Sequence, residues 1–259
     1  MLTIIPPLAH GLKCSAIVLL LILCPTVGAK DLVVGVGNFE PFFIKEGNKG
    51  LFLDLTKEIF KLLPQHTVKY TFMPNRRLAA QVANGKIDVA CNIFKDSHVK
   101  AHLSVPLFRF TDVVVSNKRK NLSIEKVADL KGLRVAAYQG AKELLGGEFK
   151  TLMTNNPNYK EQPDQSRTIL MVLHDRADVR VGDIFIFLND LKNLAGQQVT
   201  ASLDNFTIHR IWPDVYSHMA FKDSALRDDV NNAIKIIKEN GTFDAVYKRY
   251  EVHLLTDNP

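Results

Sequence analysis

The sequence has few cysteines and no disulfide framework. Only three of its 259 residues are cysteine, and Cys14 and Cys24 both lie within the first 29 residues. A mature chain without that segment would contain Cys91 alone. A single cysteine can form neither an internal disulfide nor a multi-cysteine metal site. Cys91 stands in an apolar, strand-like segment, which predicts a buried and unreactive thiol.

Strong charge asymmetry is also missing. Lysine and arginine total 33 against 27 acidic residues, and the densest basic cluster, residues 118–120, is only three residues long. That excess fits an ordinary solvated surface better than a nucleic-acid partner. Hydrophobic residues make up 46% and charged residues 23%. This balance indicates a folded globular chain and excludes a disordered or collagen-like one.

The common catalytic and cofactor motifs are absent. Residues 35–37 begin like a dinucleotide loop, but the third glycine position is Glu40. The sequence has no phosphate-binding loop, no zinc-protease helix motif and no nucleophile elbow. His98 and His102 have metal-like spacing, yet Asp96 is the single nearby carboxylate, and a solvated pair is the simpler interpretation. We therefore expect no cofactor and no metal.

The N-terminal segment has the pattern of a secretory signal. Lys13 is its single charge, and the apolar stretch 16–23 is shorter than the roughly 20 residues of a membrane-spanning helix. Small residues precede a predicted cleavage after Ala29. Two alternatives are an uncleaved anchor and lipidation at Cys24, the latter disfavoured by the bulky Leu23 before it. The expected location is the periplasm.

The remaining chain alternates short apolar runs with amphipathic segments. Leu32–Val36 predicts a buried strand, and residues 54–63 predict a helix from apolar residues spaced three and four apart. A helix is also expected over 141–153, weakened by two glycines, and a loop over the polar stretch 154–164. Strands alternating with helices indicate an α/β fold with mainly parallel sheets.

Several segments, in order along the chain, resemble the amino-acid-type periplasmic solute-binding proteins (family 3). They are residues 35–42, 50–55, 85–89, 104–108, 130–135, 175–179 and 240–247. The resemblance implies the type II periplasmic-binding fold, with two α/β lobes joined by two crossing hinge strands. Lobe one would contain residues 30–113 and 217–259, and lobe two residues 114–216. A ligand would lie in the cleft, and the lobes would close around it.

The same resemblance implies a set of binding residues. An aromatic residue of the first loop, Phe39, would cover the ligand, whereas Phe42 would belong to the core. Asp183 would receive the ligand's ammonium group, although it also stands where it can cap a helix. The turn after the predicted strand at 133–137 would face the ligand carboxylate, although it lacks the two hydroxyl groups that the family has there. The remaining expected site residues are Asn75, Arg76, Arg77 and Asn92, and those of this turn, Gln139, Gly140, Ala141 and Lys142.

One departure from the family bears on specificity. The position of the arginine that usually binds the ligand carboxylate is Ser97 here. A lysine does not reproduce the two-pronged geometry of a guanidinium. Lys95, His98, Lys100, Lys142, Arg76 and Arg77 are the candidate substitutes. A different anion, a modified amino acid or a peptide fragment therefore becomes a plausible ligand.

Three functions fit this sequence. The first is a monomeric binding protein that delivers a small polar ligand to an inner-membrane ABC permease. The second is a ligand-sensing partner of a membrane receptor, which would use the same cleft. The third is a dehydratase-like enzyme on the same fold, which needs an acid and a base in the cleft, such as Glu40 facing Asp183.

Overall fold

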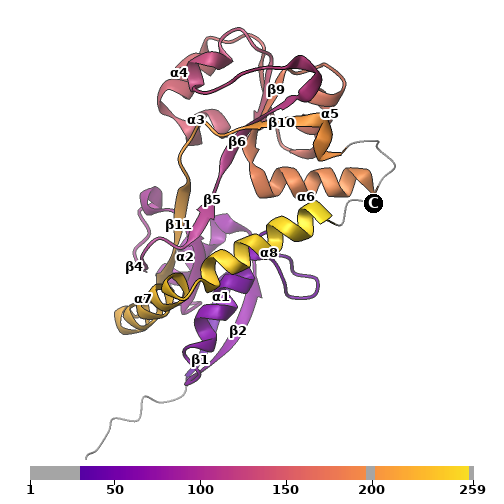
Figure 1. Ribbon diagram of the computed structural model, residues 1–259. Helices are drawn as coiled ribbons and strands as arrows, with labels where there is room; N and C mark the ends of the chain where they lie inside the picture. The colour runs from indigo at the N-terminus through magenta and orange to yellow at the C-terminus, as the bar shows by residue number, and fades with distance from the viewer. Residues whose placement is uncertain (1–29, 197–201, 257–259) are drawn as a thin grey trace, which may run out of the picture.

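The computed structural model describes residues 30–196 and 202–256, and its strands form two sheets (Figure 1). The first sheet has the order β2-β1-β3-β11-β4, with β5 paired to β11. The second has the order β10-β6-β9-β7-β8. The predicted signal segment 1–29 lies outside the described residues. Within the described ranges, no helix combines the length and apolar character needed to cross a membrane.

The strands of the first sheet are β1 (Lys30–Val36), β2 (His66–Phe72), β3 (Val89–Ile93), β4 (His102–Leu103), β5 (Phe108–Phe110) and β11 (Val215–Phe221). Those of the second are β6 (Asp112–Asn117), β7 (Val135–Tyr138), β8 (Tyr159–Gln162), β9 (Val179–Asp183) and β10 (Phe206–His209). The helices are α1 (Leu51–Lys61), α2 (Asn75–Ala83), α3 (Ala141–Leu145), α4 (Gly147–Thr154), α5 (Ser166–Leu173), α6 (Ile184–Ala195), α7 (Ser224–Glu239) and α8 (Thr242–Thr256).

The two-sheet α/β architecture confirms the predicted fold class, but each sheet is mixed rather than mainly parallel. Strand β1 pairs in parallel with β2 and β3, and β7 pairs in parallel with β8 and β9. Antiparallel pairs arise where β6 and β11, which belong to the segments connecting the sheets, run back against β9 and β3.

Two sequence expectations about local structure were wrong. The helix expected over 141–153 is two helices, because Gly146 and Gly147 have φ values of 53° and 49° and interrupt it. The polar stretch expected to be a loop contains β8, a strand at the edge of the second sheet. An edge strand that is open to solvent needs no apolar alternation, so its sequence resembles a loop.

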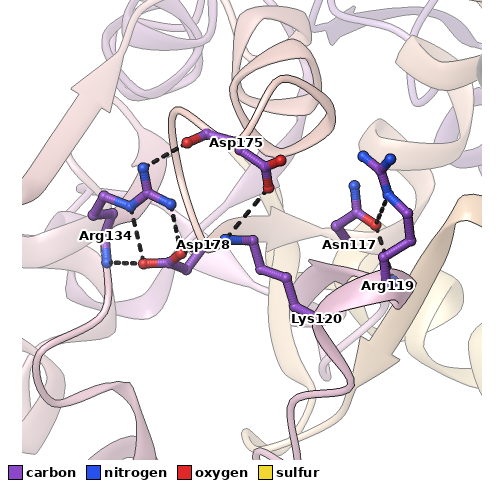
Figure 2. A network of polar contacts seen from close by, with 6 residues as sticks. All are labelled: Asn117, Arg119, Lys120, Arg134, Asp175 and Asp178. Carbon is purple, nitrogen blue, oxygen red and sulfur yellow. Dashed lines mark hydrogen bonds and ion pairs between the residues drawn. The ribbon is translucent and has the colours of Figure 1, made fainter.

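The basic cluster at residues 118–120 contributes to an ion-pair network on the second-sheet side (Figure 2). Asp178 accepts hydrogen bonds from the Nζ of Lys120 and from Nη2 of Arg134, both at 2.7 Å. Lys120 also lies 3.4 Å from Asp175. Hydrogen bonds from Arg134 hold the pKa of Asp178 well below its usual range. This network ties the start of β7 to the turn before β9.

Candidate functional site

A cavity of about 660 Å³ lies between elements of the two sheets. Its first-sheet side is formed by Phe39, Asn75, Arg76, Ala79, Asn92, Ile93, Phe94, Asp96 and Ser97. Its second-sheet side is formed by Asp112, Tyr138, Leu144, Leu145, Gln165, Asp183 and Ile186. Phe110 and Val215 line it from the connecting strands β5 and β11. Nine of these eighteen residues are apolar and nine carry polar or charged groups, which can orient a small polar ligand.

Half of the sequence-predicted site residues line this cavity: Phe39, Asn75, Arg76, Asn92 and Asp183. Arg77 and the turn Gln139, Gly140, Ala141 and Lys142 are not among the described lining residues. For all ten residues a ligand role stays a prediction. Phe42 is fully buried among core residues, as expected. Glu40 is exposed and does not line the cavity, so the facing Glu40–Asp183 pair of the enzymatic hypothesis is not formed.

The cationic side of the cavity comes from α2. Arg76 stands at its second residue, is exposed, and is the one lysine or arginine among the described lining residues. Ser97, at the position of the family's arginine, lines the same cavity. Lys95, His98 and Lys100 do not line it. Arg76 is therefore the best-placed substitute for the missing guanidinium.

Asn92 reaches the cavity from β3 through an irregular backbone. Its φ is 60°, in the left-handed region that asparagine tolerates better than most residues. Its Oδ1 accepts a 2.6 Å hydrogen bond from the Oγ of Ser217 on β11, next to a register shift in that strand. Irregular backbone of this kind clusters at binding sites.

Asp183 is almost fully buried at the end of β9 and does cap helix α6. Its Oδ1 accepts the backbone N–H groups of Phe185 at 2.8 Å and Ile186 at 3.2 Å. Its Oδ2 accepts the N–H of Thr111 at 2.9 Å, from the segment that joins the two sheets. Burial nevertheless raises the pKa of Asp183 to about 7, with a further contribution from the negative charge of Asp112.

The turn expected to meet a carboxylate already binds one from within the chain. Glu161 of β8 accepts the N–H of Gly140 at 2.7 Å and that of Lys142 at 3.1 Å. The hydroxyl of Tyr159 donates to the same carboxylate at 2.8 Å. Although burial opposes it, these hydrogen bonds lower the pKa of Glu161. Ala141 is buried in the core of the second-sheet side.

The sequence reasoning missed Asp112 and Tyr138, which both line the cavity. Asp112 opens β6, and its carboxylate accepts a long, 3.4 Å hydrogen bond from the hydroxyl of Tyr138. Burial raises the pKa of Asp112 to about 6, although Tyr138 and the charge of Arg180 oppose the shift. Nothing in the local sequence marks Asp112, because its proximity to Asp183 depends on the pairing of β6 with β9.

Residues 32–253 match the model of the bacterial extracellular solute-binding proteins, family 3. The chain belongs to that family. This solute-binding protein is 25% identical over 232 residues to the "Probable amino-acid-binding protein YxeM" of Bacillus subtilis (strain 168), covering 84% of this chain and 82% of the relative. It is 26% identical over 237 residues to the "L-cystine-binding protein TcyJ" of the same organism, covering 86% and 84%.

Solved structures agree with this assignment. An "Ancestral Cationic Amino Acid Solute Binding Protein" has a TM-score of 0.66 and 23% identity, covering 85% of this chain and 95% of that structure. An ancestral arginine-binding protein bound to glutamine has a TM-score of 0.58 and 25% identity, covering 85% and 97%. The described part of this solute-binding protein contains no group of three or more His, Cys, Asp or Glu placed to hold a metal ion.

Proposed function

We propose that this protein captures an amino acid in the cavity between its two sheets and delivers it to an ABC permease in the membrane. One observation supports this most directly. Arg76, from the first-sheet side, and Asp183, from the second-sheet side, line a single cavity. A zwitterion that places its carboxylate at Arg76 and its ammonium near Asp183 would contact both sides at once.

We further propose that capture involves closure of two lobes, residues 30–113 with 217–259 and residues 114–216. Two segments pass between the sheets, β5 into β6 and β10 into β11. They are joined where the Oγ1 of Thr111 donates to Oδ1 of Asp214 at 2.6 Å. A ligand that contacts both sides binds the closed form better and shifts the population toward it.

The expected context is that of a secreted, monomeric protein of the periplasm, released by cleavage after Ala29. The named relatives are amino-acid- and cystine-binding proteins. We propose binding without chemical conversion, because the named relatives are binding proteins and Glu40, which the enzymatic hypothesis places opposite Asp183, does not line the cavity.

The test is thermal unfolding of the chain from residue 30 onward against a panel of L-amino acids, cystine and small organic acids. A ligand present at 100 times its dissociation constant stabilises the protein by about 2.7 kcal/mol. For a chain of this size that raises the melting temperature by roughly 5–10 °C. A stabilising amino acid supports the proposal, and a panel in which organic acids alone stabilise the protein contradicts it.

A further inference from the structure

Asp112 and Asp183 occupy directly opposite positions in the antiparallel pairing of β6 with β9. Side chains at directly opposite positions project from the same face of a sheet, with Cβ atoms about 5 Å apart. Both residues line the cavity. The second-sheet wall therefore presents two neighbouring carboxylates to whatever occupies the cavity.

These two carboxylates differ in how much hydrogen-bonding capacity they have left. Asp183 accepts three backbone N–H groups, which occupy most of its acceptor positions. Within the described chain, the carboxylate of Asp112 accepts a single hydrogen bond, the 3.4 Å contact from Tyr138. Asp112 is thus the carboxylate with free acceptor positions for a cationic group.

The charges around the pair are unbalanced. Arg180 of β9 is fully buried, donates to Thr168 at 3.0 Å, and has no hydrogen-bond partner for its Nη1 within the described residues. Its positive charge acts on Asp112, Asp183 and also Asp190 of α6. One guanidinium acting on three carboxylates leaves net negative charge when all are ionised. A cation entering the cavity would reduce this excess.

We propose that Asp112 is a second ligand-binding carboxylate and that Asp112 and Asp183 together hold one cationic group of the ligand. This inference rests on the proposed function and refines it. The resemblance assigns the ligand's ammonium to Asp183 alone. In the structure, however, Asp112 has more free hydrogen-bond acceptor positions than Asp183. The cationic group is either the α-ammonium or a cation on the ligand side chain.

Titration calorimetry of the variant Asp112→Asn tests this inference. The probes are L-arginine, L-glutamine, agmatine, which lacks the carboxylate, and Nα-acetyl-L-arginine, which lacks the ammonium. The matched control is Asp229→Asn, the same charge change at an exposed position of α7. Asp112→Asn should weaken each probe that the wild type binds by at least tenfold, with Asp229→Asn unchanged. Loss of affinity for Nα-acetyl-L-arginine in the wild type would identify the α-ammonium as the group held.

Measuring ligand affinity as a function of pH distinguishes ligand binding by Asp112 from a purely structural role of this residue. Asp183 of β9 is paired opposite Asp112, Tyr138 of β7 donates a hydrogen bond to it, and the charge of Arg180 from β9 acts on it; Asp190 of α6 acts on Arg180. Because cation binding requires ionised carboxylates, wild-type affinity for L-arginine should fall between pH 8 and pH 5.5. The fall should be smaller in Asp112→Asn, which has one carboxylate fewer to protonate.

The outcomes separate this inference from the proposed function. Equal affinities in Asp112→Asn and the wild type for an amino acid would overturn the inference and leave the function standing. Binding of succinate or glutarate alone, neither of which carries a cation, would overturn both the inference and the proposed function. A wild type that binds no amino acid and no amine would reject both.

Discussion

The carboxylate of Glu161 accepts the backbone N–H of Gly140 at 2.7 Å. The resemblance had assigned that turn to a ligand carboxylate, but here a side chain of β8 holds it. Together with Lys142 and Tyr159, this contact fixes the beginning of α3. The turn is therefore ordered before any ligand binds.

Glu161→Ala should loosen this turn. Amide hydrogen exchange at Gly140 and Lys142 should accelerate by at least tenfold, because both N–H groups lose their acceptor. The stability lost should be about 1 kcal/mol or less, since Glu161 is only partly buried. Glu143→Ala, an exposed change on the same helix, is the control. Unchanged exchange at Gly140 in Glu161→Ala would show that the contact does not hold the turn.

The same contact has a pH signature. Glu161 has a lowered pKa, so the stability it contributes is present above the unfolded pKa of about 4 and is lost as the pH falls through the folded value. Exchange at Gly140 should therefore approach the Glu161→Ala rate in acid, after correction for intrinsic exchange.

Arg76→Ala and Arg77→Ala form a matched pair of neighbouring, exposed arginines on α2. Arg76 lines the cavity and Arg77 does not. Arg76→Ala should weaken amino-acid binding at least tenfold through loss of a charge-assisted bond, while Arg77→Ala should stay within twofold of the wild type. Calorimetry measures both. Equal losses in the two variants would mean that the effect is general electrostatic attraction.

At pH 4, where its raised pKa of about 7 keeps the buried carboxyl protonated, Asp183→Ala should destabilise the fold, because it removes the acceptor of three buried N–H groups. The expected loss is about 2 kcal/mol or more by chemical denaturation. Asp183→Asn keeps one carbonyl oxygen to cap α6 and should lose less stability than Asp183→Ala. If Asp183→Ala matches wild-type stability, then Asp183 does not hold α6 and the connecting segment together.

Asp112→Asn should stabilise the ligand-free protein at pH 8. The folded pKa of Asp112, about 6, lies above its unfolded value, so its ionisation progressively destabilises the fold as the pH rises from about 4 to 6. The variant should gain about 3 kcal/mol at pH 8, and the gain should vanish near pH 4. The lowered pKa of His209 is common to both proteins and cancels in the difference. A gain that does not change with pH would contradict this ionisation account.

Local patterns predicted the central elements of the fold well. Leu32–Val36 lies in β1, and the apolar spacing over 54–63 gave most of α1. Strand β8 was missed because its residues pair at a sheet edge and carry no apolar signature. Helix α3 ends earlier than the helix predicted over 141–153, because two adjacent glycines adopt positive φ values.

The sequence could predict those site residues that lie in recognisable local segments, but not those that strand pairing brings together. Phe39 stands in a segment that resembles the family, Arg76 was a candidate substitute for the missing arginine, and both line the cavity. Asp112 was not predictable, because its partner Asp183 is 71 residues away in sequence and faces it through strand register alone. The role of Glu161 likewise required knowing that β8 pairs with β7.

The most direct measurement is calorimetric titration of the best-stabilising amino acid into two serine-to-tryptophan variants. Ser97→Trp places an indole in the cavity wall, whereas Ser123→Trp makes the same change at an exposed position that does not line the cavity. The account predicts that Ser97→Trp abolishes binding and that Ser123→Trp binds like the wild type. Wild-type affinity in Ser97→Trp would contradict the assignment of this cavity as the ligand site.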